Sequence, residues 1–224
     1  MKQEFVKSQK LEKWLKWMRV IRDEIQLLVW EAKMFWEVQD IIRQNPRIQN
    51  PNPFYRYLGR SYVSHTLAGL RRQIKPQKDS ISFVGLLEDI AQHPTELSLA
   101  YYRSRRGEFI VYDRDVTKEE FSKYADSTAE YVCPQKVTAD VDTLKKAVEA
   151  CEEFADKRIA HRDKRDPKVV PTYDQLDNCI KLLDKMYVKY HLLFYAVGMT
   201  TLYPEPQYDW KVIFRESWLV KSSG

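Results

Sequence analysis

The sequence predicts an all-α protein: a helical bundle that begins with one long helix. Apolar residues recur every three or four positions along most of the chain, as they do on one face of a helix. Glycine accounts for only 6 of the 224 residues, too few for the tight turns and phosphate loops of β-sandwich or Rossmann folds. With 44% hydrophobic and 13% aromatic residues, the chain has enough apolar side chains to build a core, which excludes disorder.

The first helix is predicted from about Lys10 to Arg43. At 1.5 Å per residue it would span roughly 50 Å, and Asn45 followed by Pro46 ends it. Its apolar stripe follows the helical spacing and contains Leu11, Trp14, Leu15, Met18, Ile21, Ile25, Leu28, Ala32, Phe35 and Trp36.

Two shorter helices are expected next. The second covers residues 52–74, with Pro53 at its first helical position. The third follows Asp79 or Ser80 as its N-cap, and a short fourth segment begins near Glu96.

Residues 107–134 show no clear periodicity. A short strand over residues 109–112 is compatible with the sequence, but we find no second strand to pair with it, which argues against a sheet. Thr117 and Glu120 have the spacing of a capping box, which predicts that a helix opens there.

Two long helices are predicted near the end of the chain, over residues 140–164 and 173–197. The later helix has an apolar seam suited to close packing, within one chain or across a dimer: Leu176, Ile180, Leu183, Tyr187, Tyr190, Phe194 and Val197. A tail follows, and its apolar residues are predicted to dock on the bundle: Tyr208, Trp210, Ile213, Phe214 and Trp218.

The net charge, the hydropathy and the cysteine content of the chain limit the classes of protein to which it can belong. The net charge of +5 is too small by itself to indicate a nucleic-acid binder. No apolar run reaches the length of a membrane span, and the polar N-terminus is unlike a secretory signal. Three cysteines without C-x-x-C spacing are typical of buried thiols in a reducing compartment. We therefore expect a cytoplasmic protein with no membrane partner.

The end of the helix over residues 140–164 is the most informative segment. Continued at 100° per residue, its apolar face leads into Arg158, Arg162 and Arg165, with His161 on the flank. Unpaired charges do not enter a dry core, so this surface should line a groove, meet acidic partners or lie at a wet interface. The motifs of phosphate loops, serine hydrolases and metal sites are missing from the sequence, and we expect no metal and no other cofactor.

These residue types suit an RNA phosphate. Arginine binds phosphate through two N–H groups and keeps its proton, whereas histidine exchanges protons near neutral pH. Arg158 and His161 are one helical turn apart, and Arg71 with Arg72 could form a second phosphate-binding pair. The simpler interpretation is that each basic cluster complements the dipole at a helix C-terminus.

The run from Lys157 to Asp163 resembles the signature of the HEPN superfamily, in particular its AbiU-like abortive-infection branch. Weaker similarity extends over most of the chain from about Tyr55: residues 71–72, 79–82, 86–90, 171–190 and 208–214. The resemblance implies an all-helical bundle that dimerises, in a prokaryotic defence system of the abortive-infection or toxin–antitoxin type. In active members it implies a metal-independent endoribonuclease, whose Arg and His activate the 2′-hydroxyl and stabilise the phosphate.

Transferred to this sequence, the resemblance gives candidate residues for each role. His161 and Arg158 are the catalytic candidates, and the RNA-binding candidates are Lys157, Arg162, Arg165, Arg71 and Arg72. Active members have an Arg separated from the His by four to six residues, but here those positions are Asp156, Ala155 and Phe154.

Two functions therefore stay open: a metal-independent endoribonuclease, or a catalytically inactive module that binds RNA or a protein. The expected partners are a second copy of the chain, RNA, and a cognate antitoxin or another defence protein. The whole chain, residues 1–224, is expected to form one HEPN-like domain. Within it lie a long N-terminal helix (1–45), a motif-bearing helical hairpin (138–198) and a docking tail (199–224).

Overall fold

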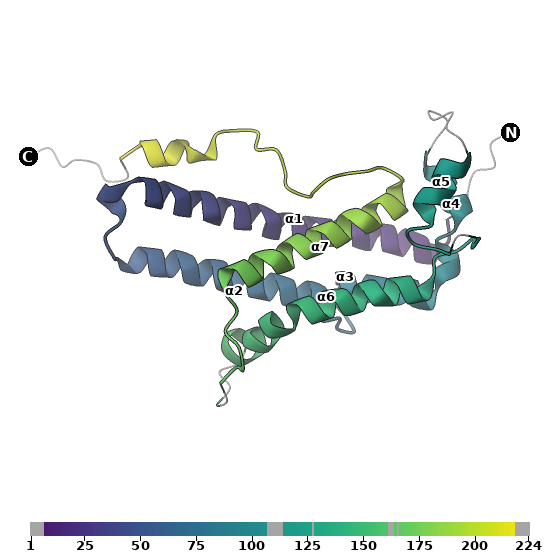
Figure 1. Ribbon diagram of the computed structural model, residues 1–224, viewed down its shortest axis with the longest axis horizontal. Helices are drawn as coiled ribbons and strands as arrows, with labels where there is room; N and C mark the ends of the chain where they lie inside the picture. The colour runs from purple at the N-terminus through teal and green to yellow at the C-terminus, as the bar shows by residue number, and fades with distance from the viewer. Residues whose placement is uncertain (1–6, 107–113, 127, 161–163, 165, 218–224) are drawn as a thin grey trace, which may run out of the picture.

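The computed structural model describes residues 7–106, 114–126, 128–160, 164 and 166–217. They form an all-α bundle, which confirms the predicted fold class (Figure 1). Within these ranges no strand occurs, and a single isolated bridge pairs Ser98 with Tyr131. The α-helices are α1 (Gln9–Gln44), α2 (Pro53–Ile74), α3 (Phe83–Gln92), α4 (Leu99–Arg106), α5 (Arg114–Phe121), α6 (Pro134–Phe154) and α7 (Tyr173–Tyr195).

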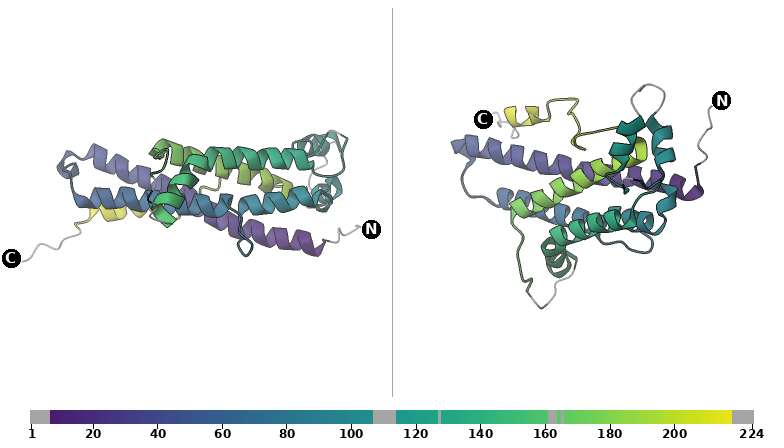
Figure 2. Two further views of the ribbon diagram at one scale, coloured as in Figure 1. Left: turned by 90° about the horizontal axis from the view of Figure 1, so that it is seen from below. Right: turned by 45° about the vertical axis from the view of Figure 1, so that its right-hand side comes forward.

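The long helix α1 runs along most of the molecule and contacts α2, α3 and α7 (Figures 1 and 2). Its N-cap is Ser8, whose side chain accepts a hydrogen bond from the Leu11 amide, and its C-cap is Asn45. Both ends agree with the prediction to within one residue. The buried stripe ends at Leu28, so only the first half of α1 belongs to the core.

The other helices pack around α1, and α2 and α7 also reach its second half, where Phe35 stacks on Tyr62 and Trp36 donates to Asp177. Figure 2 shows α2 and α3 following one another on one side, with α6 alongside both, and α4 and α5 gathered at the end near the N-terminus. Helix α7 contacts α1, α2, α4 and α6, and its buried seam confirms six of the seven predicted positions. The seventh, Val197, is 58% exposed, because Ala196 adopts a left-handed conformation (φ 52°) and ends the helix.

Buried tyrosines connect α7 to its neighbours. The hydroxyl of Tyr187 donates to the carbonyl of Met18 on α1 at 3.0 Å, and that of Tyr101 on α4 donates to the carbonyl of Phe194 at 2.8 Å. Burial raises the pKa of Tyr101 to about 12. Each hydroxyl thus has a partner in the core, as a buried tyrosine requires.

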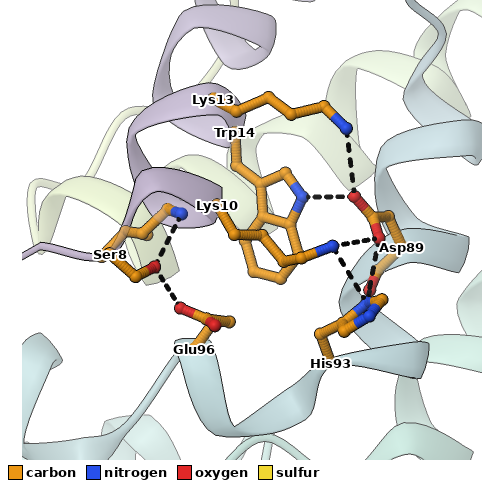
Figure 3. Close-up of polar contacts among 8 residues, drawn as sticks. Ser8, Lys10, Lys13, Trp14, Asp89, His93 and Glu96 are labelled. Atoms are coloured by element: carbon orange, nitrogen blue, oxygen red, sulfur yellow. Dashed lines mark hydrogen bonds and ion pairs between the residues drawn. The ribbon is translucent and has the colours of Figure 1, made fainter.

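A polar cluster around Asp89 joins the start of α1 to α3 (Figure 3). The carboxylate accepts hydrogen bonds from Trp14 Nε1 at 2.8 Å and Lys10 Nζ at 3.1 Å, and it also pairs with His93 at 3.0 Å. Burial alone would raise the pKa of Asp89, but these bonds and the charges of Lys10 and Lys13 bring it below its ordinary value. The ionised carboxylate therefore stabilises this contact.

The third and fourth helices begin later than predicted. The N-cap of α3 is Ser82, not Asp79 or Ser80: its hydroxyl accepts from the Gly85 amide at 3.1 Å. The hydroxyl of Ser80 instead bonds within the preceding turn. The fourth helix begins at Leu99, three residues after the predicted start.

The capping box predicted at Thr117 is wrong. Helix α5 already begins at Arg114, so Thr117 lies inside it, and its hydroxyl accepts a hydrogen bond from Arg106 Nη1 at 3.3 Å. Glu120 does not cap the helix either; it accepts from the hydroxyl of Tyr102 at 2.8 Å. The strand suggested over residues 109–112 lies outside the described residues.

The C-terminal tail runs along α1 (Figure 1). Leu202 is buried, its carbonyl accepts from Gln26 of α1 at 3.0 Å, and the ring of Tyr203 stacks on Trp30 at 5.8 Å. Tyr208 is 74% exposed, so the prediction that it docks is wrong, and Trp218 lies outside the described residues. The division into segments 1–45, 138–198 and 199–224 stays a prediction.

Candidate functional site at the end of α6

The candidate site lies where α6 passes into a π-helical turn, η3 (Ala155–Ala160), against the C-terminal end of α2. The sequence predicts one α-helix as far as residue 164, but the α-helical part ends at Phe154. A π-helical turn has more residues than an α-helical one, so the 100° projection does not hold beyond Phe154. The face assigned to Arg158 and the residues after it therefore does not follow from the periodicity of α6.

Four charged side chains meet between α2 and this turn, and we call them the α2–α6 ion-pair cluster: Arg71, Lys75, Glu152 and Asp156. Arg71 Nε lies 2.7 Å from Asp156 Oδ1. Lys75 Nζ lies 3.0 Å from Asp156 Oδ2 and 3.1 Å from Glu152 Oε1. All four side chains are between 28% and 41% exposed, although the two atoms that meet in the Arg71–Asp156 pair, Nε and Oδ1, are themselves buried.

The cluster favours the ionised forms of Asp156 and Lys75. Burial acts to raise the pKa of Asp156, but its bond to Lys75 and the charges of Arg71 and Lys75 lower it below the ordinary value. The pKa of Lys75 is raised, chiefly by its bonds to Asp156 and Glu152. Two positive and two negative charges balance, so the cluster itself is neutral.

Arg72 is placed differently from its neighbour Arg71. Its guanidinium lies 2.9 Å from the carboxylate of Glu24, so Arg72 pairs with a residue of α1 and not with one of α6. Of the two α2 arginines predicted to bind RNA, the structure thus brings only Arg71 to the turn after α6.

Lys157 and Arg158 are half-buried and also have carboxylate partners. Lys157 Nζ lies 2.7 Å from Glu153 Oε1, one turn earlier, and Arg158 pairs with Asp166 in the segment that leads to α7. The bond to Lys157 lowers the pKa of Glu153. His161, Arg162 and Arg165 lie outside the described residues.

Comparison with protein families identifies the chain. The model of the AbiU2 family of HEPN proteins matches residues 11–212, which is most of the sequence. The chain belongs to the AbiU2 family of HEPN proteins. No curated protein and no solved structure matches it. Membership of AbiU2 points to a defence role of the abortive-infection type.

The resemblance to active HEPN proteins predicts an arginine at residue 154, 155 or 156, and at the last of these positions the chain has the carboxylate of Asp156. Asp156 is one of the three positions that the motif allows for that arginine, and the structure places a guanidinium beside it, from Arg71 on α2. The pairing of Arg71 with Asp156, and the part that Lys75 and Glu152 play beside it, were not predicted from the sequence. The available signal was spacing, because each pair, Arg71 with Lys75 and Glu152 with Asp156, is four residues apart and so lies on one helix face.

A shallow hollow of about 390 Å³ adjoins the cluster. It is lined by Lys75 and Glu152 of the cluster, and by Lys145, Lys146 and Glu149 of α6. Lys145 is paired with Glu88 at 2.7 Å. The hollow is large enough for a phosphate group, and Lys145 and Lys146 line it together with Lys75 and Glu152 of the cluster.

The remaining histidines have structural partners. His65 pairs with Glu31 at 3.0 Å and His93 with Asp89 at 3.0 Å. Burial lowers the pKa of His191, whose Nδ1 lies 3.0 Å from the carbonyl of Val197. Within the described ranges, no group of three His, Cys, Asp or Glu side chains is arranged to hold a metal ion, and no helix is both long and apolar enough to cross a membrane.

Proposed function

We propose that this AbiU2-family protein acts in abortive-infection defence, in the cytoplasm, as a metal-independent endoribonuclease. The observation that supports the proposal is the contact of 2.7 Å between Arg71 and Asp156. The motif position that lacks its own arginine has one beside it, supplied by another helix. In this proposal, Arg71 has the role of the arginine that is missing from the motif.

In this mechanism His161 is the general base. It removes the proton of a ribose 2′-hydroxyl, the 2′-oxygen attacks the adjacent phosphorus, and the bond to the 5′-oxygen breaks with protonation of that oxygen. The products are a 2′,3′-cyclic phosphate and a free 5′-hydroxyl. Arg71 and Arg158 stabilise the negative charge that develops on the phosphate oxygens. The phosphate must first replace Asp156 as the partner of Arg71.

The experiment is RNA cleavage by the purified full chain in EDTA. We expect cleavage products with cyclic phosphate ends, loss of cleavage in His161→Ala, and a fall of about a hundredfold or more in Arg71→Ala, the low end for removal of one stabilising donor. Arg72→Ala is the matched control, because it removes the same side chain one position along, where it faces Glu24. Intact RNA with the unaltered protein, over a range of RNAs, would rule out this function.

A second candidate is a catalytically inactive module that binds RNA or a protein partner. The neutrality of the α2–α6 ion-pair cluster favours it, since Asp156 opposes the approach of a phosphate. In this case RNA binds without being cleaved, or His161→Ala changes only the binding of a cognate antitoxin or another defence protein.

Both candidate functions include the formation of a homodimer. Light scattering of the purified chain measures its mass in solution, and a monomer at micromolar concentration would remove the dimer from the proposal.

A further inference from the structure

Two cysteines from different helices touch beneath the surface between α6 and α7. The Sγ atoms of Cys151 and Cys179 are 3.8 Å apart, and both side chains are buried. The Cys179 thiol also donates to the carbonyl of Ala147 at 3.2 Å. The Cys151 thiol is therefore the donor to Cys179, which leaves the two sulfur atoms in direct contact.

Small molecules can reach this pair. A surface hollow of about 270 Å³ between α6 and α7 is lined by both cysteines. Its other lining residues include the small side chains Ala147 and Ala150, with Gln175 and Asn178 at α7. A molecule of the size of hydrogen peroxide fits in this volume, whereas a protein or a large thiol reagent does not.

We propose that Cys151 and Cys179 form an intramolecular disulfide when the protein meets a peroxide. The thiolate of Cys179 attacks one peroxide oxygen, which gives a sulfenic acid and, after protonation of the leaving oxygen, one water. The Cys151 sulfur then attacks the Cys179 sulfur, the S–O bond breaks, and a second water leaves. Two thiols and one peroxide thus become one disulfide and two waters, with the sulfurs oxidised and the peroxide reduced.

The surroundings assign the first step to Cys179. The hydrogen bond from Cys151 lowers the pKa of Cys179 below its ordinary value of 9.0, and the same contact, together with burial, raises that of Cys151. A thiolate is the nucleophile in such reactions. Cys133 offers a comparison within the chain: it is only half-buried, and its thiol donates to Gln135.

The position of the disulfide gives it a consequence for the candidate site. The two cysteines are 28 positions apart, and the chain between them contains η3 and every residue of the motif. Cys151 lies about one turn before Asp156 on α6, and Cys179 lies on α7. A disulfide between them would therefore hold together the two ends of the segment that contains the motif. Closing this loop also removes conformational freedom from the unfolded chain.

The test treats the reduced full chain with graded hydrogen peroxide. We expect the intact mass to fall by two hydrogen atoms, and non-reducing peptide mapping to link the peptides of Cys151 and Cys179. The melting temperature should rise by roughly 5–10 °C and return after reduction. These readouts need no RNA, so they can fail or succeed independently of the proposed function.

Matched variants make the result decisive. Cys133→Ser should retain both the link and the rise in melting temperature, whereas Cys151→Ser should lose both and leave a sulfenic acid on Cys179 that a dimedone probe labels. Oxidation of Cys133 before the pair, a disulfide between two chains, or an unchanged mass would each overturn the proposal.

Discussion

Arg71 Nε lies 2.7 Å from Asp156 Oδ1, so an ion pair joins the end of α2 to the turn that follows α6. The carboxylate of Asp156 holds the guanidinium of Arg71 in this position. It also occupies the place at which an anionic ligand would have to contact that guanidinium. In the function that we propose, an RNA phosphate has to compete with Asp156 for Arg71. This competition makes Asp156 the most informative position to change.

Asp156→Asn should strengthen the binding of single-stranded RNA. The change removes the carboxylate that faces Arg71 and leaves Lys75 paired with Glu152 alone, and it should make the plot of log affinity against log salt steeper by about 0.7 per new phosphate contact. Because the ion pair is partly exposed, unfolding free energy should change by about 1 kcal/mol or less. Fluorescence anisotropy with a labelled RNA at several salt concentrations measures the effect.

Glu24→Gln is the control for that experiment, since it removes one negative charge and frees Arg72 instead. Equal gains in affinity for the two variants would mean that only net charge matters, and would contradict a specific role of Arg71.

Acid should weaken the protein partly through Asp89. Its pKa is lowered in the folded state, from an ordinary value of 3.8. The corresponding stability is fully present above that ordinary value and is lost as pH falls through the lower, folded-state pKa. Asp89→Asn should cost about 1–3 kcal/mol at neutral pH and make stability less dependent on pH below about 4.

Urea unfolding from neutral pH to about pH 3 tests this prediction. Glu88→Gln changes the neighbouring residue, whose partner Lys145 is exposed, and should cost about 1 kcal/mol or less. A cost for Asp89→Asn no larger than this control would show that the bonds of Trp14 and Lys10 add little.

Asp177→Ala should destabilise the contact of α1 and α2 with α7. This one carboxylate accepts hydrogen bonds from Trp36 of α1 and from the Tyr62 hydroxyl of α2, the latter at 2.6 Å. Removing it leaves two donors without their acceptor, and Tyr62 is buried, so the loss should be about 1–3 kcal/mol. Thermal unfolding measures it, with exposed Asn178→Ala as a control that should stay within about 0.5 kcal/mol. Similar melting temperatures for both variants would contradict the prediction.

Gly69→Ala should loosen the contact between α1 and α2. A Cβ atom at Gly69 would lie 2.5 Å from Cδ2 of Leu28 and 3.1 Å from its Cγ, and Leu28 is buried in the core. We expect a loss of about 1–3 kcal/mol. Gly198→Ala is the matched change, because nothing lies within 4 Å of its added Cβ. Chemical denaturation that ranks Gly198→Ala as the more damaging change would refute this account.

The bounds and the buried face of α1 could be predicted from the sequence because local signals define this helix. The apolar spacing predicts the inward face, and Ser8 and Asn45 cap the two ends with their own neighbours. The buried positions match this spacing: Leu11, Trp14, Met18, Ile21, Ile25 and Leu28.

The start of α3 was missed because a partner distant in sequence takes part in it. The side-chain oxygen of Gln73 on α2 accepts the amide hydrogen of Phe83 at 3.1 Å, which satisfies a donor at the first turn of α3. Local patterns cannot distinguish Ser80 from Ser82 as N-cap without that contact. Thr117 was misassigned for the same reason, since its hydroxyl binds Arg106 of α4.

At the candidate site, the residue types could be predicted and their arrangement could not. Residues 155–160 contain neither glycine nor proline, so the sequence of this segment does not indicate a change from α-helical to π-helical geometry. That Arg71, and not Arg72, faces Asp156 depends on how α2 packs against α6, which is a property of the tertiary structure.

The contact between α1 and α7 also has a consequence for synthesis of the chain. The hydroxyl of Tyr187 reaches the carbonyl of Met18, 169 positions earlier. At about 5–20 residues per second, a ribosome needs roughly 10–30 s to make the intervening polypeptide. During that interval the apolar stripe of α1 lacks its main partner, and the nascent protein should depend on α2 and α3, or on a chaperone, to keep it from water.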